Sequence, residues 1–214
     1  MRAGGTILTA DVSRLLGWAY GPPGSIPRSG TVELAPQGAN CGALGRGLIR
    51  WFVDFTTVNP VDALYIEAPR DPRHMGAKTS EAALRNMIGL IYVLESVAEM
   101  RGVFYRREVD VNKMRAHFIG KPGVRMDRDA WKAAALRQCR ILRWEVADDN
   151  AAEACGLWSY ACAVEAPKSQ LQTGPLFTGA SAFSAPGVAL RPAGGKPARV
   201  SSTTYHPEVD DIPD

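Results

Sequence analysis

The amino-acid sequence predicts an α/β fold in which helices cover both faces of a mixed five-stranded sheet. The N-terminal part holds three short runs of strand-forming residues separated by glycine, proline and serine, which is typical of an antiparallel meander. From residue 41 on, apolar residues recur at helical spacing, and two further strand-like runs interrupt the helical segments. A meander followed by alternating strands and helices predicts antiparallel and parallel strand pairs in one sheet.

The expected meander consists of three short strands, at residues 6–12, 15–20 and 31–34. The Gly-Pro-Pro-Gly sequence at residues 21–24 supplies the turn before the third of them. A strand of another kind is expected at residues 62–67, because its centre, Ala-Leu-Tyr-Ile, is almost wholly apolar. Strands that are covered on both faces have such runs. We expect one more strand of this kind, at residues 103–109.

Five helices are expected, over residues 41–58, 80–100, about 111–118, about 127–142 and about 150–165. The second has clear end signals, because Ser80 can cap its N-terminus and Gly102 follows its last turn. The last begins with Asp-Asp-Asn, which puts acidic residues where the helix dipole favours them. The predicted order of elements is therefore β-β-β-α-β-α-β-α-α-α.

The C-terminal segment differs in composition from the rest of the chain. Proline and glycine are scattered there among serine, threonine and alanine, with little periodicity. Such a segment buries too little apolar surface to offset the entropy that it would lose on ordering. We expect one domain at residues 1–168 and a disordered Pro/Gly/Ser-rich tail at residues 169–214.

Basic residues are concentrated in one part of the chain. The whole sequence has a formal net charge of +3, but residues 101–143 alone carry 12 basic and 4 acidic side chains. A local excess of this size attracts polyanions such as nucleic acids. On charge alone, a solvated basic helix surface is an equally good interpretation.

The cysteines and the apolar runs argue against several classes of protein. Cys41, Cys139, Cys155 and Cys162 form no Cys-x-x-Cys pair, so neither a zinc site nor a disulfide framework is indicated. No apolar run reaches the roughly 18–20 residues of a membrane span. The N-terminus lacks the apolar core of a signal peptide. We therefore expect a cytoplasmic protein with free thiols and no membrane partner.

Acidic residues occur at three places where strands end or a helix begins. Asp11 interrupts the apolar run of the first strand, where a charge is unfavourable unless it is paired or bound to a metal. Glu67 ends the fourth strand. Asp149 and Glu153 lie four residues apart at the start of the last helix and therefore share one face of it.

Each of these acids also has a purely structural interpretation. Asp11 would then form a turn at a strand end, and Glu67 would pair with Arg70. The Asp-Asp-Asn sequence at residues 148–150 would be a helix cap. Taken together, the acids suit a hard cation such as Mg²⁺, which binds a few carboxylates and keeps positions open for phosphate and water. Two such ions about 4 Å apart stabilise both the attacking and the leaving oxygen in phosphodiester hydrolysis.

Four short motifs follow one another along the chain. The first is Ile-Leu-Thr-Ala-Asp-Val-Ser at residues 7–13 with Gly-Trp-Ala at 17–19, and the second is Tyr-Ile-Glu-Ala-Pro at 65–69. The third is basic, with Val-Asn-Lys at 111–113, Gly120 and Lys132, and the fourth is Asp-Asp-Asn-Ala-Ala-Glu-Ala at 148–154. In this order the motifs resemble those of RuvC-type Holliday-junction resolvases, the fourth as it is written in phage-type members. The resemblance covers about residues 6–165.

This resemblance implies a ribonuclease H-like fold and a metal-dependent, structure-selective endonuclease that cleaves Holliday junctions or other branched DNA. It also implies a two-metal mechanism with Mg²⁺, which Mn²⁺ can replace, and a homodimer that makes two symmetric cuts. The acids implied as catalytic and metal-binding are Asp11, Glu67, Asp149 and Glu153, and Lys132 is the residue implied to stabilise transition-state charge. The residues expected to bind DNA are Lys113, Arg115, Lys121, Arg125 and Lys132.

One position departs from the family pattern. The last acidic residue of the family is usually Asp, whereas this chain has Glu153, whose extra methylene shifts the carboxylate oxygens by about 1 Å. Three alternatives stay open: a ribonuclease H-like nuclease for RNA–DNA hybrids or flaps, a non-catalytic branched-DNA-binding protein, and a sugar-kinase-like ATPase. The last is disfavoured because no Gly-rich phosphate loop pairs with a second Asp-Gly motif.

Overall fold

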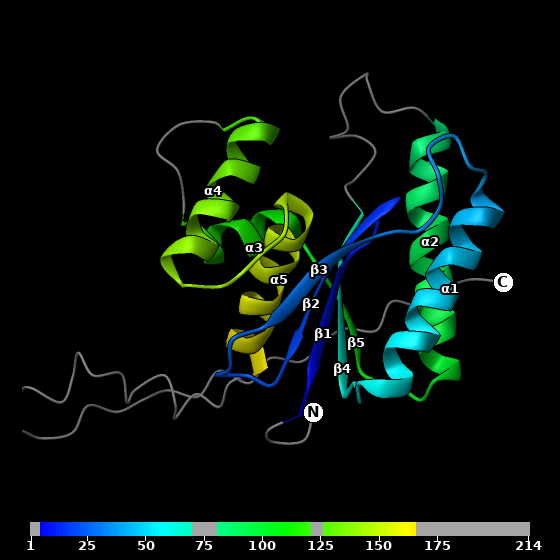
Figure 1. Cartoon of the computed structure of the whole chain (residues 1–214), viewed down its shortest axis with the longest axis horizontal. Coiled ribbons are helices and arrows are strands. Elements are labelled where there is room, and N and C mark those ends of the chain that lie inside the picture. Colours follow the sequence, from blue (N-terminus) through cyan, green and yellow to red (C-terminus); the bar gives the residue numbers. More distant parts are fainter. Residues whose placement is uncertain (1–4, 70–80, 121–125, 166–214) are drawn as a thin grey trace, which may run out of the picture. The chain divides into compact units, whose positions relative to one another are not determined.

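The computed structural model describes residues 5–69, 81–120 and 126–165. Within them one five-stranded sheet has the strand order β3-β2-β1-β4-β5 (Figure 1). The strands are β1 (Ile7–Asp11), β2 (Leu15–Gly21), β3 (Arg28–Glu33), β4 (Ala63–Glu67) and β5 (Arg106–Val109). The first three pair antiparallel, and β1, β4 and β5 pair in parallel. The mixed five-stranded sheet is therefore confirmed.

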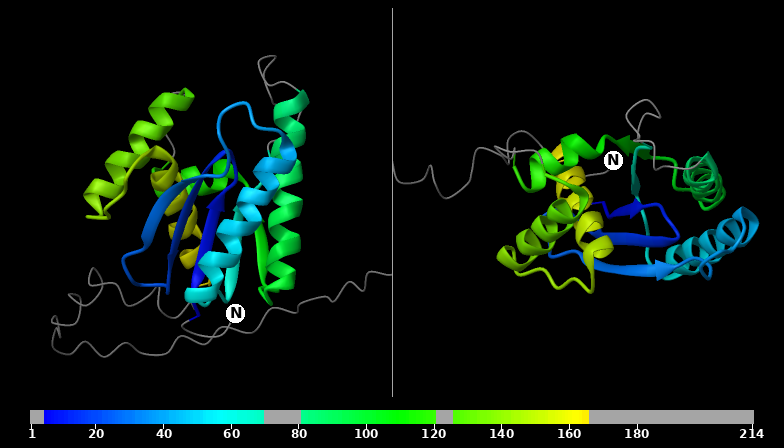
Figure 2. Two further views of the ribbon diagram at one scale, coloured as in Figure 1. Left: turned by 45° about the vertical axis from the view of Figure 1, so that its right-hand side comes forward. Right: turned by 90° about the horizontal axis from the view of Figure 1, so that it is seen from above.

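Helices cover both faces of this sheet, as predicted (Figure 2). They are α1 (Cys41–Val58), α2 (Glu81–Met100), α3 (Val111–Phe118), α4 (Arg128–Ile141) and α5 (Asp149–Glu165). Helices α1 and α2 pack together on one face. Helix α5 lies on the other face in contact with β1 and β2, and α3 and α4 pack against it.

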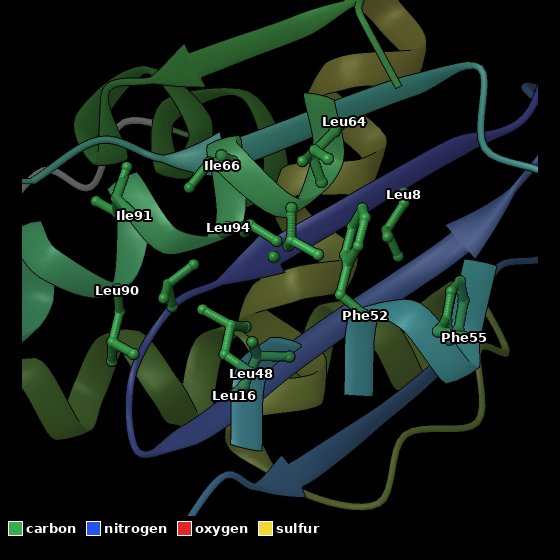
Figure 3. Packing of buried hydrophobic residues seen from close by; sticks show 14 of the residues in the cluster. Leu8, Leu16, Leu48, Phe52, Phe55, Leu64, Ile66, Leu90, Ile91 and Leu94 are labelled. Atoms are coloured by element: carbon green, nitrogen blue, oxygen red, sulfur yellow. The ribbon is translucent and has the colours of Figure 1, made fainter. Parts of the chain in front are cut away.

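Side-chain alternation along the central strands divides the core into two clusters. On β1, Leu8 faces α1 and α2, whereas Ile7 faces α5. On β4, Leu64 and Ile66 face α1 and α2 (Figure 3), whereas Tyr65 faces α5. Because side chains alternate between the two faces, the position of a residue along its strand determines which face its side chain meets.

Short polar side chains cap the N-termini of several helices. Asn40 accepts a hydrogen bond from the backbone N–H of Ala43 at the start of α1, and Asp127 accepts one from Ala130 at the start of α4. Gly102 ends α2 with a φ of 77°, a backbone conformation that favours glycine. These local signals determine where the helices begin and end.

Two strand boundaries differ from those expected by more than one residue. β5 begins at Arg106 rather than at residue 103, because the N–H of Val103 is used to close the C-terminus of α2 on the carbonyl of Ala98. β3 begins at Arg28 rather than at residue 31, since its pairing with β2 continues to Tyr20. Among the described residues no helix is long and apolar enough to span a membrane. The predicted tail at residues 169–214 lies outside the described residues, so the domain boundary stays a prediction.

Candidate active site

Asp11 and Glu67 hold adjacent positions at the ends of two parallel strands. The register of β1 and β4 ends with Ala10 opposite Ile66, and the next residue on each strand is one of the two acids. By alternation, both acids continue the series of side chains that faces α5. The topology of the sheet thus brings together two acids that lie on separate strands.

The start of α5 lies directly over Gly17, the register partner of Asp11 on β2. Asp11 is in register with Gly17, and a Cβ atom added to Gly17 would lie 2.3 Å from the carbonyl oxygen of Asn150. Glycine is therefore required here for α5 to approach the sheet. One turn further along, the hydroxyl of Thr9 donates a hydrogen bond of 2.9 Å to the carbonyl of Ala154.

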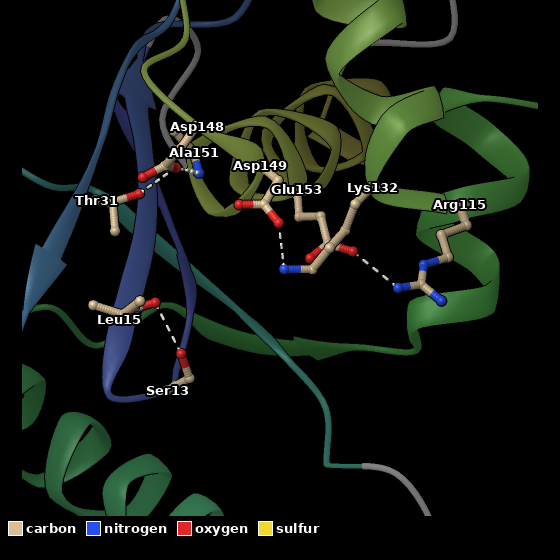
Figure 4. Close-up of polar contacts among 9 residues, drawn as sticks. All are labelled: Ser13, Leu15, Thr31, Arg115, Lys132, Asp148, Asp149, Ala151 and Glu153. Atoms are coloured by element: carbon tan, nitrogen blue, oxygen red, sulfur yellow. Dashed lines mark hydrogen bonds and ion pairs between the residues drawn. The ribbon is translucent and has the colours of Figure 1, made fainter. Parts of the chain in front are cut away.

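Asp148 is the N-terminal cap of α5. Its Oδ1 accepts a hydrogen bond of 2.9 Å from the backbone N–H of Ala151 and one of 2.6 Å from the hydroxyl of Thr31 on β3 (Figure 4). For this one acid the structural interpretation, a helix cap, is correct. The cap also ties α5 to β3 and thereby sets where the following acids lie.

Asp149 forms an ion pair with Lys132 of α4. The Lys132 ammonium lies 2.5 Å from Oδ2 of Asp149, and both side chains are partly buried (Figure 4). The hydrogen bond from Lys132 holds the pKa of the Asp149 carboxyl below its usual value, against the opposing effect of burial. Asp149 is therefore ionised and already neutralised by a side chain.

Glu153 is almost enclosed, with 8% of its surface exposed. Its Oε1 accepts a hydrogen bond of 2.9 Å from the guanidinium of Arg115, whose side chain is 11% exposed (Figure 4). The same guanidinium lies over the ring of Trp131, 5.2 Å from its centroid. Arg115 is thus held between α5 and α4.

Asp11 lies in the electrostatic field of these pairs. Burial, and then repulsion by Glu153, raise the pKa of the Asp11 carboxyl from 3.8 to about 6. The positive charges of Lys132 and Arg128 on α4 and of Arg115 on α3 oppose this increase. A carboxylate that is unfavourable for these reasons is stabilised by a bound cation.

The donor atoms suit a hard divalent cation. Asp11 and Glu67 end adjacent strands, Glu153 of α5 acts on the pKa of Asp11, and oxygen is the ligand atom that Mg²⁺ prefers. In the described part of the chain no group of three or more acidic, histidine or cysteine side chains is gathered closely enough to hold a metal ion. The ion pairs of Asp149 and Glu153 keep the two α5 carboxylates on their basic partners instead.

The residues predicted to bind DNA lie in different environments. Lys113 is exposed in the first turn of α3, Lys132 is partly buried beside Asp149, and Arg115 is enclosed by Glu153 and Trp131. Lys121 and Arg125 lie outside the described residues.

Sequence reasoning missed three residues of the site. They are Gly17, on which α5 packs, Trp131, which lies against the guanidinium of Arg115, and Arg128, whose charge acts on Asp11. Only for Arg128 did the sequence hold a signal, because it directly follows the helix cap Asp127 in the basic segment.

No protein-family model and no curated protein matches this chain. Its fold is similar to that of RuvC from Thermus thermophilus, with a TM-score of 0.54 and 12% identity over 74% of this chain and 95% of that one. The same protein in complex with a Holliday-junction substrate gives a TM-score of 0.53 at 11% identity, over 74% and 94% of the two chains. The yeast mitochondrial Holliday junction resolvase Ydc2 gives 0.52 at 10%, over 73% and 77%. At such identities the likeness shows the fold, which is ribonuclease H-like, as in RuvC.

Proposed function

We propose that this chain is a metal-dependent endonuclease that cleaves Holliday junctions or other branched DNA. The observation that carries the proposal is that Asp11 and Glu67 end adjacent strands on the face covered by α5, whose acidic first turn packs on Gly17, the register partner of Asp11. It occurs in a fold similar to those of RuvC, of which one structure contains a Holliday-junction substrate, and of the resolvase Ydc2. Likeness of fold and a suitable acidic site together favour a nuclease over other functions of this fold.

The residues that would hold Mg²⁺, or Mn²⁺ in its place, are Asp11 and Glu67 together with the α5 acids Asp149 and Glu153. When bound, the cation would lower the pKa of a water molecule and stabilise negative charge on the oxygens of the phosphodiester. In the chain without metal, the Asp11 carboxyl has a pKa of about 6 and is mostly ionised above that pH. The ionised form is the one that a hard cation binds.

The chain's own basic residues would bind and orient the DNA. Lys132 lies beside the acids, and we assign its ammonium to the charge that develops on the reacting phosphate. Lys113, which is exposed, would contact the phosphate backbone, as would Lys121 and Arg125. Arg115 would act through Glu153, because its guanidinium is enclosed. A homodimer would place two such sites on the two equivalent strands of a four-way junction.

A second function is supported by a specific observation. Since Lys132 and Arg115 already neutralise Asp149 and Glu153, the chain would also suit a protein that binds branched DNA without cutting it. The two candidates differ in one measurable product, a nicked strand.

A synthetic four-way junction distinguishes the two functions. We expect Mg²⁺-dependent nicking that EDTA abolishes and that Asp11→Asn removes. A flap and an RNA–DNA hybrid of the same length test substrate class, and we expect the junction to be cut faster than either. Tight junction binding without nicking in Mg²⁺ or Mn²⁺ would instead assign the non-catalytic function.

A further inference from the structure

The three positive charges that act on Asp11 differ in what holds them. Lys132 and Arg128 come from α4, and Arg115 comes from α3. The side chains of Lys132 and Arg115 are each bonded to an acid of α5 (Figure 4). Arg128, by contrast, forms no ion pair with any of the residues that the structure describes. It is therefore the one of the three whose charge is still available to a ligand.

Arg128 and Lys132 lie on the same face of α4. They are four residues apart, a spacing that brings side chains on a helix surface to about 5–6 Å between their Cβ atoms. The ammonium of Lys132 lies 2.5 Å from Oδ2 of Asp149, so this face of α4 is turned toward the start of α5. Arg128 continues the same face by one turn. Two like charges at this spacing disfavour a helix unless a negative charge lies nearby.

The two acids beside Arg128 in the sequence do not pair with it. Asp127 is the cap of α4, and its Oδ1 accepts a hydrogen bond of 2.8 Å from the backbone N–H of Ala130. Asp129 is the next residue of the helix, and consecutive helical side chains point about 100° apart, so they do not face each other. Arg128 thus keeps its positive charge beside the acidic site without a local acid to engage it.

Arg128 is also the accessible member of the three. Its side chain is exposed, whereas those of Arg115 and Lys132 are only 11% and 18% exposed. A phosphate can therefore reach Arg128 without breaking an existing ion pair. Breaking an enclosed pair would leave a buried charge without its partner, which is strongly unfavourable. A guanidinium also binds a phosphate through two parallel hydrogen bonds, a geometry that an ammonium does not offer.

We propose that Arg128 binds the phosphate that is to be cut and holds it beside Asp11 before the reaction. The inference rests on the proposed function, because a reacting phosphate exists only if the chain cuts DNA. It divides the work between two neighbours on α4. Arg128 stabilises the bound substrate and so affects affinity, whereas Lys132 acts on the charge of the transition state and so affects the rate.

Binding of a labelled four-way junction to the full-length chain, measured in EDTA so that no metal-dependent cutting takes place, gives the first test. Arg128→Gln is expected to lower the affinity about tenfold, the effect of losing a hydrogen bond to a charged group, and to lower the salt dependence by about one ion. Arg128→Lys keeps the charge but not the two parallel hydrogen bonds, so we expect it to recover part of the loss.

Arg137→Gln is the matched control. Arg137 is also an exposed arginine of α4, but it lies nine residues after Arg128, about two and a half turns, and therefore on the opposite face of the helix. Its loss should change the affinity for the junction by less than twofold. The melting temperature of both variants should equal that of the wild type, because both side chains are exposed. Equal losses of affinity in the two variants would overturn the inference.

Junctions in which a neutral methylphosphonate replaces one phosphate at a time locate the contact. At the phosphate that the wild type cuts in Mg²⁺, the replacement should weaken binding of the wild type about tenfold more than binding of Arg128→Gln, because the variant has already lost the contact. No such difference at any position, or one only at a phosphate that is not cut, would overturn the inference and leave the nuclease proposal standing.

A chain that binds the junction but nicks no strand in Mg²⁺ or Mn²⁺ would instead contradict the nuclease proposal. The role of Arg128 at a reacting phosphate would then fall with it, while the affinity measurements would still show whether Arg128 contacts DNA.

Discussion

The carbonyl oxygen of Asn150 occupies the space that a side chain on Gly17 would need. A Cβ atom there would lie 2.3 Å from this oxygen and 2.7 Å from the carbonyl carbon, both of them backbone atoms that cannot rotate away. Gly17 is also the register partner of Asp11. The same contact therefore determines how closely α5 approaches the sheet and how closely its acids approach Asp11.

Gly17→Ala is expected to push α5 away from β2 and to weaken metal binding. Overpacking of this kind costs about 1–3 kcal/mol of stability. Thermal unfolding and Mn²⁺ titration would measure the two effects. Gly89→Ala on α2 is the matched control, because a Cβ there meets nothing within 4 Å and alanine favours a helix. Equal behaviour of the two variants would show that the close approach does not position the acids.

Asp11→Asn is expected to abolish cleavage of a four-way junction and to preserve or tighten binding of the junction. The change removes one metal ligand and one negative charge that would face phosphate. Gel-shift and nicking assays on the same junction separate the two properties. Asp54→Asn, at an exposed position of α1, is the control and should cut normally. Mg²⁺-dependent cutting by Asp11→Asn would exclude the proposed role of Asp11.

The raised pKa of Asp11 predicts how the free energy of unfolding depends on pH in the absence of metal. The pKa of Asp11 is about 6 in the folded chain, against an ordinary value of 3.8, so the folded state binds the proton more tightly than the unfolded state. The free energy of unfolding should therefore fall as pH rises from about 4 to above 6, by on the order of 1–3 kcal/mol. In Asp11→Asn this loss should be absent, so the variant should be the more stable one at neutral pH.

Denaturant unfolding of both proteins at several pH values, in EDTA, checks this expectation. Added Mg²⁺ should then restore the stability of the wild type more than that of the variant, since only the wild type has the carboxylate to bind it. A difference between the two proteins that does not change with pH would contradict the raised pKa of Asp11.

Lys132→Ala is expected to slow cleavage by about 100-fold while changing junction affinity only a few-fold. An ammonium that acts on transition-state charge affects the rate more than binding. Single-turnover cleavage and equilibrium binding give the two numbers. Lys113→Ala is the comparison, because an exposed phosphate contact should weaken binding and lower its salt dependence by about one ion. Equal losses of rate and affinity in Lys132→Ala would reassign it to DNA positioning.

Periodicity along the sequence predicted the order and the type of the ten elements. The apolar runs around Asp11 and before Glu67 also indicated that both acids end covered strands, since a charge in such a run needs a partner or a metal. Local signals were sufficient here because strand alternation, helix spacing and caps depend on residues close together in the chain. The boundary of β5 was wrong because Val103 serves the C-terminus of α2 instead, an alternative that local propensity does not distinguish.

The sequence alone determined the fold class and singled out the candidate acidic residues, because both follow from patterns among residues that are close together in the chain. Only the tertiary structure decided how these acids are used. Asp148 caps a helix, Asp149 pairs with Lys132, and Glu153 pairs with Arg115, a residue 38 positions away that was expected to bind DNA. The physical reason is that such pairings depend on how closely α3, α4 and α5 pack over the sheet. That distance is set by contacts such as Asn150 on Gly17, which sequence spacing does not encode.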